Sequence, residues 1–593
     1  MILRYTLFCT LLVSSLAAQH PITPVLPRYQ TEQESQNMRL GLHPGPLSSG
    51  LVTPPSLPVR AMAEWEELQA LVIAWNGQQN ILSEIVRAAR EECNVIICCE
   101  NQSVINTAKN VLIGKGIDIS SNVTFLIAPN NSIWIRDYGP NCVYANDVDS
   151  LYLVDWIYNR PRPKDDAVPQ IIGDYLSVPV YATTQAPFDL VNTGGNFMSD
   201  GMGTAFASQL VLAENGPDNQ FGQSNHSVPE IEGILHDFMG IQRYITLEPL
   251  PYDGIHHIDM HMKLLDEETL LVGKYPQGIA DGPQIEANIQ YVTSTFQSSF
   301  GTPYKVVHIP MPPDASNAYP DNNGDYRTYA NAVFVNKTVL LPFYEKKFDT
   351  TAQRIWQESL PGYKIVGINC NSIIGSLGAI HCITKEIGVA DPLRVVHQAL
   401  PCMNNTAWPN GYPVWANLAH RSGVAAAKIY YTTDTTTAWQ SVDLPYYPLD
   451  DTTWSHRGFI PPQPDGSTVY YYIQATANTG KTVVRPLPAP KGWWKFCVTG
   501  SVAAQEALAA NLLDVYPNPA AAITCIPVTT TAKTAGSIRL FNTLGQQVVS
   551  VFEGELPAGK SNYFLNAGQY APGAYFVQLQ TSVQTMLKKL VIR

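Results

Sequence analysis

Four polar segments interrupt an otherwise apolar part of the chain and supply the residue types of nucleophilic catalysis. They are Trp134-Ile-Arg136-Asp137, His257-Ile-Asp259, Tyr329-Ala-Asn331 and a glycine-bearing loop that ends in His381-Cys382. A cysteine together with a histidine is typical of acyl transfer through a thiolate. Two carboxylates are unusual for that task, because an amide substrate carries no charge.

The two carboxylates favour a planar, cationic substrate. A guanidinium presents parallel N–H pairs that a carboxylate accepts in fork geometry. Asp137 and Asp259 would fix its plane and make its central carbon more electrophilic. In a strand, His257 and Asp259 would project from the same face, and this two-residue spacing favours His257 over His256. A metal site is the alternative interpretation of the His-x-Asp pair, and spacing alone leaves it open.

The elements that position these segments alternate between strand and helix in a predicted α/β domain at residues 55–395. Strands are expected at 71–75, 94–98, 123–127, 269–273, 304–309, 332–335, 339–342 and 364–367, and helices at 81–92, 104–113, 285–300 and 349–360. Helical periodicity disappears afterwards, and alternating runs between proline-rich turns predict a β-sandwich at 396–500. A linker is expected at 501–513 and a second β module at 514–593, with a hairpin turn at Asn542–Gly545.

Composition places the chain among exported globular proteins. Of its 593 residues, 45% are hydrophobic, which excludes a disordered chain, and the net charge of −12 without a basic cluster argues against nucleic-acid binding. A signal peptide is predicted at residues 1–18, because Arg4 precedes an apolar run and small residues. That run is too short to span a bilayer, and no later stretch approaches ~20 apolar residues. Residues 19–54 are interpreted as an N-terminal extension.

The ten cysteines do not form a disulfide framework. Cys9 leaves with the signal peptide, so the nine that remain include at least one unpaired thiol, explained by either catalysis or burial. Cys402 and Cys497 bracket the predicted β-sandwich, and the sequence leaves open whether they are bridged.

The order W-x-R-D, G-G-N, H-x-D, Y-x-N and H-C over residues 55–395 resembles the guanidino-group-modifying superfamily, in particular agmatine deiminase and the Porphyromonas-type peptidylarginine deiminase. The resemblance implies a five-bladed, pseudo-symmetric α/β propeller, followed here by two all-β sandwich domains. Residues 514–593 resemble the type A C-terminal sorting domain of type IX secretion, with Val515-Tyr-Pro-Asn-Pro519 at the start and Lys588-Lys589 at the end. This implies contact with the type IX machinery and a secreted or surface-attached protein.

Site residues follow from the same resemblance. Cys382 matches the nucleophile, His257 the general acid/base, Asp137 and Asp259 the guanidinium-holding carboxylates, and Asn331 a residue near the thiol, while Trp134 is assigned to substrate binding. The implied reaction passes through a thiouronium intermediate to citrulline and ammonia, and the nearby cation and histidine would favour the thiolate. No organic cofactor or catalytic metal is implied. A structural calcium ion is compatible with the resemblance, although the sequence has no EF-hand loop.

Arg160-Pro161-Arg162 bears on the substrate, because the proline holds both cations toward one anion on a stiff segment. The segment resembles the element in which two arginines bind the free α-carboxylate of a C-terminal arginine, which implies arginine-containing peptides as partners. Gly254 departs from the family, which has an aromatic residue three positions before its histidine, and a substrate lid is lost with it. Two alternatives stay open: a deiminase of agmatine or another small guanidine, as in putrescine biosynthesis, and a non-catalytic surface protein.

Overall fold

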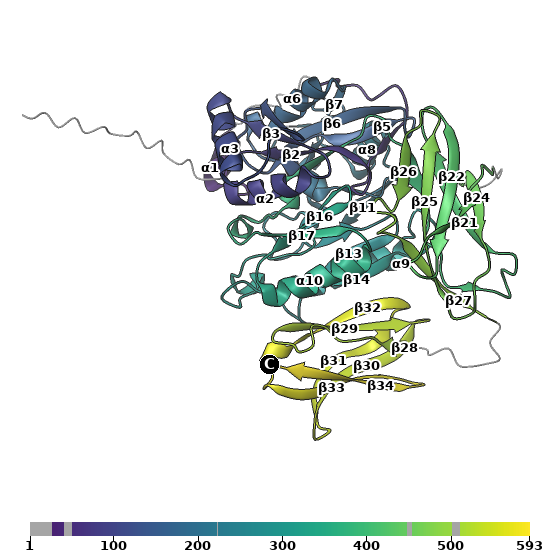
Figure 1. The fold of residues 1–593 in the computed structure, drawn as a ribbon. Coiled ribbons are helices and arrows are strands. Elements are labelled where there is room, and N and C mark those ends of the chain that lie inside the picture. The colour runs from purple at the N-terminus through teal and green to yellow at the C-terminus, as the bar shows by residue number, and fades with distance from the viewer. Residues whose placement is uncertain (1–25, 41–49, 222, 448–453, 501–509) are drawn as a thin grey trace, which may run out of the picture.

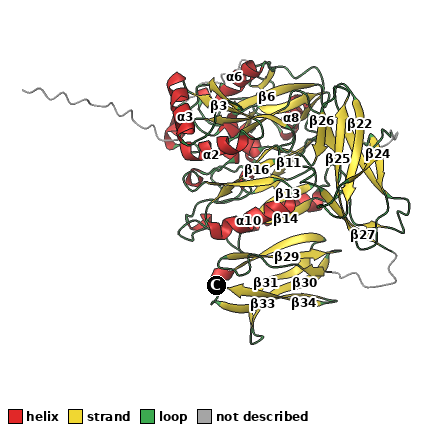
Figure 2. Ribbon diagram, in the orientation of Figure 1, coloured by secondary structure: helices red, strands yellow, loops and turns green. Residues whose placement is uncertain are grey.

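The computed structural model describes residues 26–40, 50–221, 223–447, 454–500 and 510–593. The predicted signal peptide lies outside these ranges. Figure 1 shows three parts: an α/β domain, a strand-rich part packed against one flank of it, and a separate C-terminal module below it. Figure 2 shows that helices gather in the α/β domain, whereas the other two parts consist almost entirely of strands and loops.

The α/β domain contains five small mixed sheets. Their orders are β1-β5-β6-β7 with β8 beside β6, β9-β10-β11, β12-β13-β14, β15-β16-β17, and β18-β2-β3-β4. The strands are β1 (Val59–Ala61), β2 (Leu68–Ala74), β3 (Asn94–Cys99), β4 (Val123–Ile127), β5 (Asn141–Ala145), β6 (Ser150–Tyr158), β7 (Val180–Thr183), β8 (Val191–Asn192), β9 (Met198–Ser199), β10 (Thr204–Ser208), β11 (Arg243–Leu247), β12 (Met262–Leu264), β13 (Thr269–Lys274), β14 (Lys305–Pro310), β15 (Val333–Val335), β16 (Thr338–Phe343), β17 (Lys364–Asn369) and β18 (Lys385–Gly388).

Each of these sheets combines an antiparallel pair with a parallel pair. β5–β6, β9–β10, β12–β13, β15–β16 and β18–β2 are antiparallel, and β6–β7, β10–β11, β13–β14, β16–β17 and β2–β3 are parallel. A parallel pair needs a crossover connection. Helices supply it: α5 (Pro163–Asp166) and α6 (Val168–Leu176), α7 (Leu210–Asn215) and α8 (Val228–Met239), α9 (Gly282–Thr295), α10 (Lys346–Ser359), α2 (Gln79–Ala89), and α3 (Gln102–Gly114) between β3 and β4.

The predicted strands of this domain all form, within a few residues of their expected bounds. The helix expected at 285–300 is shifted toward the N-terminus. It begins at Gly282 with Pro283 in its first turn, where the missing N–H of proline costs nothing. It ends at Thr295, because Phe296 adopts an extended conformation.

The second part builds its own core from two sheets, β19-β21-β24 and β20-β27-β25-β22-β23 with β26 beside β25. Its strands are β19 (Arg394–Val396), β20 (Met403–Asn404), β21 (Tyr412–Ala419), β22 (Val424–Thr432), β23 (Gln440–Asp443), β24 (His456–Ile460), β25 (Thr468–Ala477), β26 (Thr482–Arg485) and β27 (Trp494–Thr499). A disulfide joins Cys402 to Cys497, which settles the pairing that the sequence left open. The seven other cysteines in the described ranges are free and buried.

The C-terminal module has the sheets β28-β29-β32 and β31-β30-β33-β34 around a third core. Its strands are β28 (Ala510–Leu512), β29 (Ile523–Thr530), β30 (Thr534–Asn542), β31 (Gln547–Leu556), β32 (Gly559–Asn566), β33 (Gly573–Thr581) and β34 (Thr585–Ile592). The predicted linker at 501–513 is wrong at its end, because β28 pairs with β29 and buries Ala510 and Leu512. The predicted hairpin turn joins β30 to β31, with Gly545 at a positive φ of 77°.

None of the helices in the described ranges has both the length and the apolar character that a bilayer crossing requires.

The disulfide yields a direct prediction. When the unfolded, unreduced chain is treated with iodoacetamide, Cys402 and Cys497 should stay unmodified while the other described cysteines react. Peptide mass spectrometry before and after reduction checks this. Because the bond closes a loop of 95 residues, the double substitution C402S/C497S should destabilise residues 394–499 by about 2–4 kcal/mol. Labelling of both cysteines without a reductant would contradict the pairing.

Candidate active site

Each of the five sheets has one reactive segment just before a strand of its antiparallel pair. They form α4 (Ile135–Tyr138) before β5, η1 (Gly194–Asn196) before β9, η2 (Ile258–Met260) before β12, a loop with Asn331 before β15, and η5 (His381–Ile383) before β18. Contacts between α4 and η1, α4 and η5, and η1 and η2 bring these short turns together. One position in each sheet therefore contributes to a common site.

The His-x-Asp pair does not lie on a strand, so that prediction is wrong. His257 precedes the 3₁₀ helix η2, which contains Asp259. Both side chains are fully buried, and His257 Nδ1 lies 3.6 Å from Asp137 Oδ1. His256 adopts a left-handed φ of 57° and is only partly buried, so the two neighbouring histidines differ in environment.

A residue that the sequence analysis did not single out occupies the centre of the site. The guanidinium of Arg28 donates from Nε and Nη2 to Asp137, both at 2.8 Å, and from Nη1 and Nη2 to Asp259, both at 3.1 Å. Its fifth N–H, on Nη1, points to Cys382 Sγ at 2.6 Å. All five donors of a guanidinium are thus satisfied, and the Arg28 side chain is 0% exposed. The predicted carboxylates do hold a guanidinium, and it belongs to the chain itself.

Charge pairing accounts for the ionisation of this cluster. Burial alone would raise the pKa of Asp137 and Asp259, but attraction by Arg28 lowers both, that of Asp259 well below its usual value. Burial likewise would lower the pKa of Arg28, but the two aspartates raise it well above its ordinary value. An unpaired charge at this depth would be costly, so both carboxylates require a cation.

Cys382 lies beside this pair, with its Sγ 3.1 Å from Asn331 Nδ2 and 3.6 Å from Asp259 Oδ2. Burial raises the pKa of the Cys382 thiol well above its usual value and outweighs the opposing effect of Arg28. The nearby cation does favour the thiolate of Cys382, as expected, but burial has the larger effect on its pKa in this closed arrangement. Burial, helped by Arg28, also lowers the pKa of His257 to about 3. Neither ring nitrogen of His257 makes a hydrogen bond within the described chain.

The three predicted substrate-binding residues all contact the segment around Arg28. Arg160 Nε donates to the carbonyl oxygen of Arg28 at 3.0 Å, and Arg162 Nη2 donates to those of Pro27 at 2.8 Å and Tyr29 at 3.3 Å. Trp134 Nε1 donates to the carbonyl oxygen of Leu26 at 2.8 Å. The arginine pair thus lies against peptide backbone on both sides of a buried arginine side chain.

A second layer of buried charge supports the first. His381 bridges Asp259 and Glu64, with Nδ1 2.9 Å from Asp259 Oδ2 and Nε2 3.0 Å from Glu64 Oε1. Glu64 also accepts from Lys263. Arg136 makes a bidentate pair with Glu386 at 2.8 and 2.6 Å, and its Nε donates to the carbonyl oxygen of His381. These contacts fix the backbone that carries Cys382.

Two glycines allow the backbone to approach the guanidinium. A Cβ at Gly195 would overlap Arg28 Nη2 and would lie 2.7 Å from His257 Nδ1 and 2.8 Å from Asp137 Oδ1. Gly195 N also donates to that aspartate oxygen at 3.2 Å. A Cβ at Gly378 would overlap the ring of Trp134 and lie 3.1 Å from Cys382 Sγ. Only glycine leaves room for the guanidinium and the sulfur.

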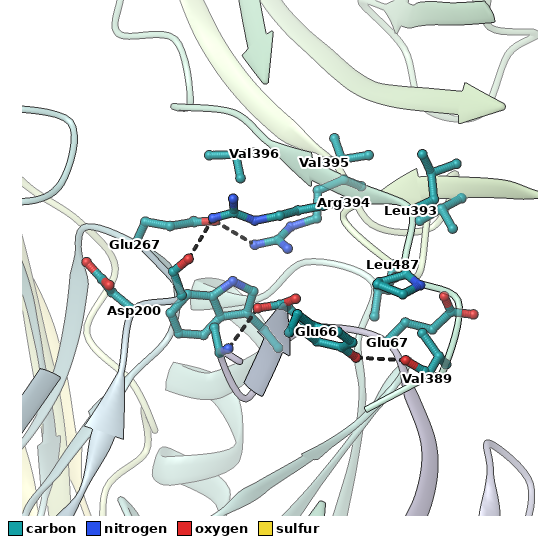
Figure 3. Close-up of a pocket in the computed structure, with 17 residues that line it drawn as sticks. Glu66, Glu67, Asp200, Glu267, Val389, Leu393, Arg394, Val395, Val396 and Leu487 are labelled. Atoms are coloured by element: carbon teal, nitrogen blue, oxygen red, sulfur yellow. Dashed lines mark hydrogen bonds and ion pairs between the residues drawn. The ribbon is translucent and has the colours of Figure 1, made fainter. Parts of the chain in front are cut away.

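Figure 3 shows a separate pocket, between the α/β domain and the strands around Arg394. Acidic side chains of Glu66, Asp200 and Glu267 line it together with Arg394. It contains neither Cys382 nor His257, so we do not place the chemistry there.

Comparison with known proteins agrees with this geometry. Residues 60–387, more than half of the chain, match the Porphyromonas-type peptidyl-arginine deiminase family. The chain belongs to this family. Residues 514–593 match the secretion system C-terminal sorting domain, which directs export by type IX secretion.

Relatives of this peptidyl-arginine deiminase family member are named for a smaller substrate. A "Putative agmatine deiminase" of Vibrio parahaemolyticus is 25% identical over 341 residues, covering 52% of this chain and 86% of the relative. Another protein of that name, from Yersinia pseudotuberculosis, is 26% identical over 368 residues, 55% and 95% of the two chains. An X-ray structure described in the same words shares the fold, with a TM-score of 0.50 at 22% identity over 57% of this chain and 98% of that one. The chain is thus a hydrolase of guanidino C–N bonds with a mixed α/β fold.

Arg28 and Glu34 were not predicted as site residues, because they belong to the N-terminal extension of this deiminase. Glu34 Oε1 accepts from Arg162 Nε at 2.7 Å, and its Oε2 lies 3.2 Å from Nη2. The only available signal was an arginine and a glutamate in a stretch with few charges. Glu64, Arg136 and His381 lie in segments that carry the family resemblance, where a charged residue beside each reactive one was the available signal.

Gly195 provides a test of the packing around the guanidinium. G195A should lower the unfolding midpoint, because the added Cβ overlaps Arg28 Nη2. We expect a loss of about 3–5 kcal/mol, as for breaking a buried ion pair. G233A is the matched control, since a Cβ there meets no atom within 4 Å and alanine favours helix α8. Equal unfolding midpoints of both variants would contradict the close approach.

The buried, neutral His257 predicts a pH dependence of stability. Its folded pKa of about 3 lies below the usual ~6.5, so its stabilising contribution is present above pH ~6.5 and is lost as the pH falls toward 3. Between pH 6 and 4, wild type should therefore lose stability relative to H257Q by about 1.4 kcal/mol per pH unit. Denaturant unfolding across this range measures the difference. H236Q, at an exposed histidine, should parallel wild type, and parallel curves for H257Q would show that His257 is not buried neutral.

Proposed function

We propose that this protein is an exported deiminase that hydrolyses the guanidinium of peptidyl-arginine to peptidyl-citrulline and ammonia. The observation that supports it best is the pose of Arg28, an arginine within a polypeptide. Its guanidinium lies between Asp137 and Asp259 beside Cys382, while its carbonyl oxygen contacts Arg160. Every predicted site residue contacts this one arginine or lies next to a residue that does.

The arginine pair favours a peptide with a C-terminal arginine. The Arg28 carbonyl oxygen that contacts Arg160 would be one oxygen of the α-carboxylate in such a peptide. Arg162 already binds a carboxylate, that of Glu34, and its Nη1 has no hydrogen-bond partner among the described residues. Two buried or half-buried cations suit an anion, and agmatine has none to offer. With agmatine as the substrate, Arg160 and Arg162 would have no substrate anion to bind.

The proposed mechanism uses the site residues in named roles. The Cys382 thiolate attacks the central guanidinium carbon, whose plane Asp137 and Asp259 fix, and forms a tetrahedral adduct. His257 gives a proton to the departing ammonia, leaving a thiouronium. Water that loses a proton to His257 then attacks the same carbon, and the C–S bond breaks to release the ureido product and the thiolate. Asn331 Nδ2 donates to the sulfur throughout. No cofactor or metal takes part in these steps.

The architecture proposed for this activity is a five-bladed propeller. Its support is the strand pattern that recurs in all five sheets, each with its reactive turn before one strand of the antiparallel pair. The two following parts, at about 394–499 and 510–593, each place two sheets around one core, as sandwiches do. The sorting domain makes the type IX secretion machinery a partner, and arginine-containing peptides are the proposed partners of the active site.

A small-guanidine deiminase is the second candidate, because the relatives are named for agmatine. Three substrates separate the two functions: a short peptide ending in free arginine, the same peptide amidated at its C-terminus, and agmatine. Each is incubated with wild type, R28A, C382A/R28A and R160A/R162A/R28A. The R28A background removes the guanidinium that fills the site.

We expect R28A to form citrulline from the free-carboxylate peptide, with at least about tenfold lower kcat/KM for the amide, because the second carboxylate oxygen is lost. C382A/R28A should form no citrulline. In R160A/R162A/R28A, kcat/KM for the free-carboxylate peptide should fall about 100-fold or more, and kcat/KM for the amidated peptide should not fall. Colorimetric detection of the ureido product measures turnover of all three substrates. Best turnover of agmatine, unaffected by loss of Arg160 and Arg162, would identify a small-guanidine deiminase instead.

A further inference from the structure

We propose that residues Leu26–Leu40, called here the inhibitory segment, act as an intramolecular inhibitor that keeps the deiminase latent until the segment is released. The inference rests on the proposed function, since it names the regulation of the same site. Its basis is that the segment fills the place of the substrate and leaves none of the guanidinium of Arg28 exposed.

The inhibitory segment imitates both charged ends of the proposed substrate. Arg28 supplies the guanidinium for Asp137 and Asp259, and Glu34 supplies a carboxylate for Arg162. Backbone carbonyl oxygens of residues 26–29 accept hydrogen bonds from Trp134, Arg160 and Arg162, and Arg28 N donates to the Ser376 carbonyl oxygen at 3.1 Å. The contacts therefore extend along the backbone, as expected for a docked peptide.

The local fold of the inhibitory segment fixes the positions of Arg28 and Glu34, the two residues that imitate the substrate, relative to each other. Helix α1 (Glu32–Arg39) starts with a capping box in which Thr31 and Glu34 bond to each other. Both carboxylate oxygens of Glu34 are used: Oε2 accepts from Thr31 N at 2.8 Å, and Oε1 accepts from Arg162 Nε. The same carboxylate that begins the helix anchors it to the arginine pair. Arg28 lies only three residues before this cap, so binding of Glu34 to Arg162 also positions Arg28.

Arg28 is bound as an inhibitor rather than as a substrate. Cys382 Sγ accepts an N–H of Nη1, and an N–H of a guanidinium lies in the plane of the group. Attack on the central carbon requires an approach from above or below that plane.

The position where the family's aromatic residue is absent lies near the same contact. A Cβ at Gly254 would lie 3.2 Å from Leu377 Cδ1, and the preceding residue, Ser376, accepts from Arg28 N. Gly254 is exposed, so no side chain from this position covers the site. The inhibitory segment packs close to where such a cover would begin.

The segment also carries a natural point of release. Between residues 26 and 60 the chain has three arginines and no lysine, at positions 28, 39 and 60. Arg28 and Arg60 are buried, whereas Arg39 at the end of α1 is exposed. An arginine-specific peptidase outside the cell would therefore cut after Arg39 first. The covalent link to the domain would be lost, and the segment could dissociate.

Accessibility of Cys382 tests the inference without relying on turnover. Folded wild type, R28A, E34A and E32A are treated with iodoacetamide, and labelling of the Cys382 peptide is followed by mass spectrometry. Glu32 lies in the same helix and is exposed, so E32A is the matched control for E34A. Trypsin-treated wild type opens the site without any substitution, and R39Q, treated in the same way, controls for cleavage after Arg39.

We expect labelling of Cys382 to rise at least about tenfold in R28A and after trypsin, to rise less in E34A, and to stay at the wild-type rate in E32A and in trypsin-treated R39Q. Turnover of the arginine peptide should rise in the same order. Equal labelling of wild type, R28A and trypsin-treated protein would overturn the inference, as would conversion of Arg28 to citrulline in purified wild type, which would make the segment a substrate.

Failure of the proposed function gives a different result. If R28A and trypsin-cleaved protein label rapidly but form no ureido product from peptide or agmatine, the segment still blocks the site, and the deiminase assignment fails. If wild type turns over the peptide as fast as R28A and labels equally fast, the deiminase stands, and the inhibitory role is excluded.

Discussion

The burial of two carboxylates around one planar cation is the constraint on which the rest of the structure depends. Asp137 and Asp259 are at most 1% exposed, and an ionised carboxylate at such depth costs several kcal/mol unless a cation and hydrogen bonds compensate it. A guanidinium meets this demand with five N–H donors in one plane, whereas an ammonium cannot serve both carboxylates in fork geometry. The two carboxylates therefore select a guanidinium before any chemistry begins. The layer beneath, in which His381 joins Asp259 to Glu64, holds one carboxylate in the required orientation.

The fold satisfies this constraint by delivering one short turn from each sheet to the same place. Strands buried on both faces need apolar residues, so polar side chains gather where the strands begin. Because the chain enters each antiparallel pair through such a turn, residues far apart in sequence, such as Asp137 and Cys382, meet on elements held by separate sheets. β18 pairs with β2 and so joins the end of the α/β domain to its start, which fixes η5 against the rest of the site. Precision at the sulfur thus comes from rigid sheets rather than from the turns themselves.

Much of this could be predicted from the sequence, and the failures have physical causes. Apolar runs between turn residues predicted the strands of the α/β domain, and the spacing of residue types predicted a guanidinium site. Strand geometry did not apply to His257 and Asp259, because His256 takes a left-handed conformation and a 3₁₀ helix follows it. β28 was not predicted because an alternation of apolar and polar residues over only three positions does not distinguish a strand from a linker. Arg28 could not be predicted, since its partners lie 109, 231 and 354 residues away and no local pattern encodes such contacts.

A site that holds a guanidinium between two carboxylates is open to any arginine that the chain itself can bring to it. A tethered segment competes at an effective concentration in the millimolar range for short flexible links, so even a modest intrinsic affinity keeps a dilute peptide out. Cleavage of the tether changes the competition without altering a single contact, because the freed segment is diluted away. The charges of Arg28 and Glu34 also offset charges of Asp137, Asp259 and Arg162 that would be unpaired in the empty site. Inhibition and folding thus draw on the same ion pairs, and a substrate that replaces the segment restores the compensation that its departure removes.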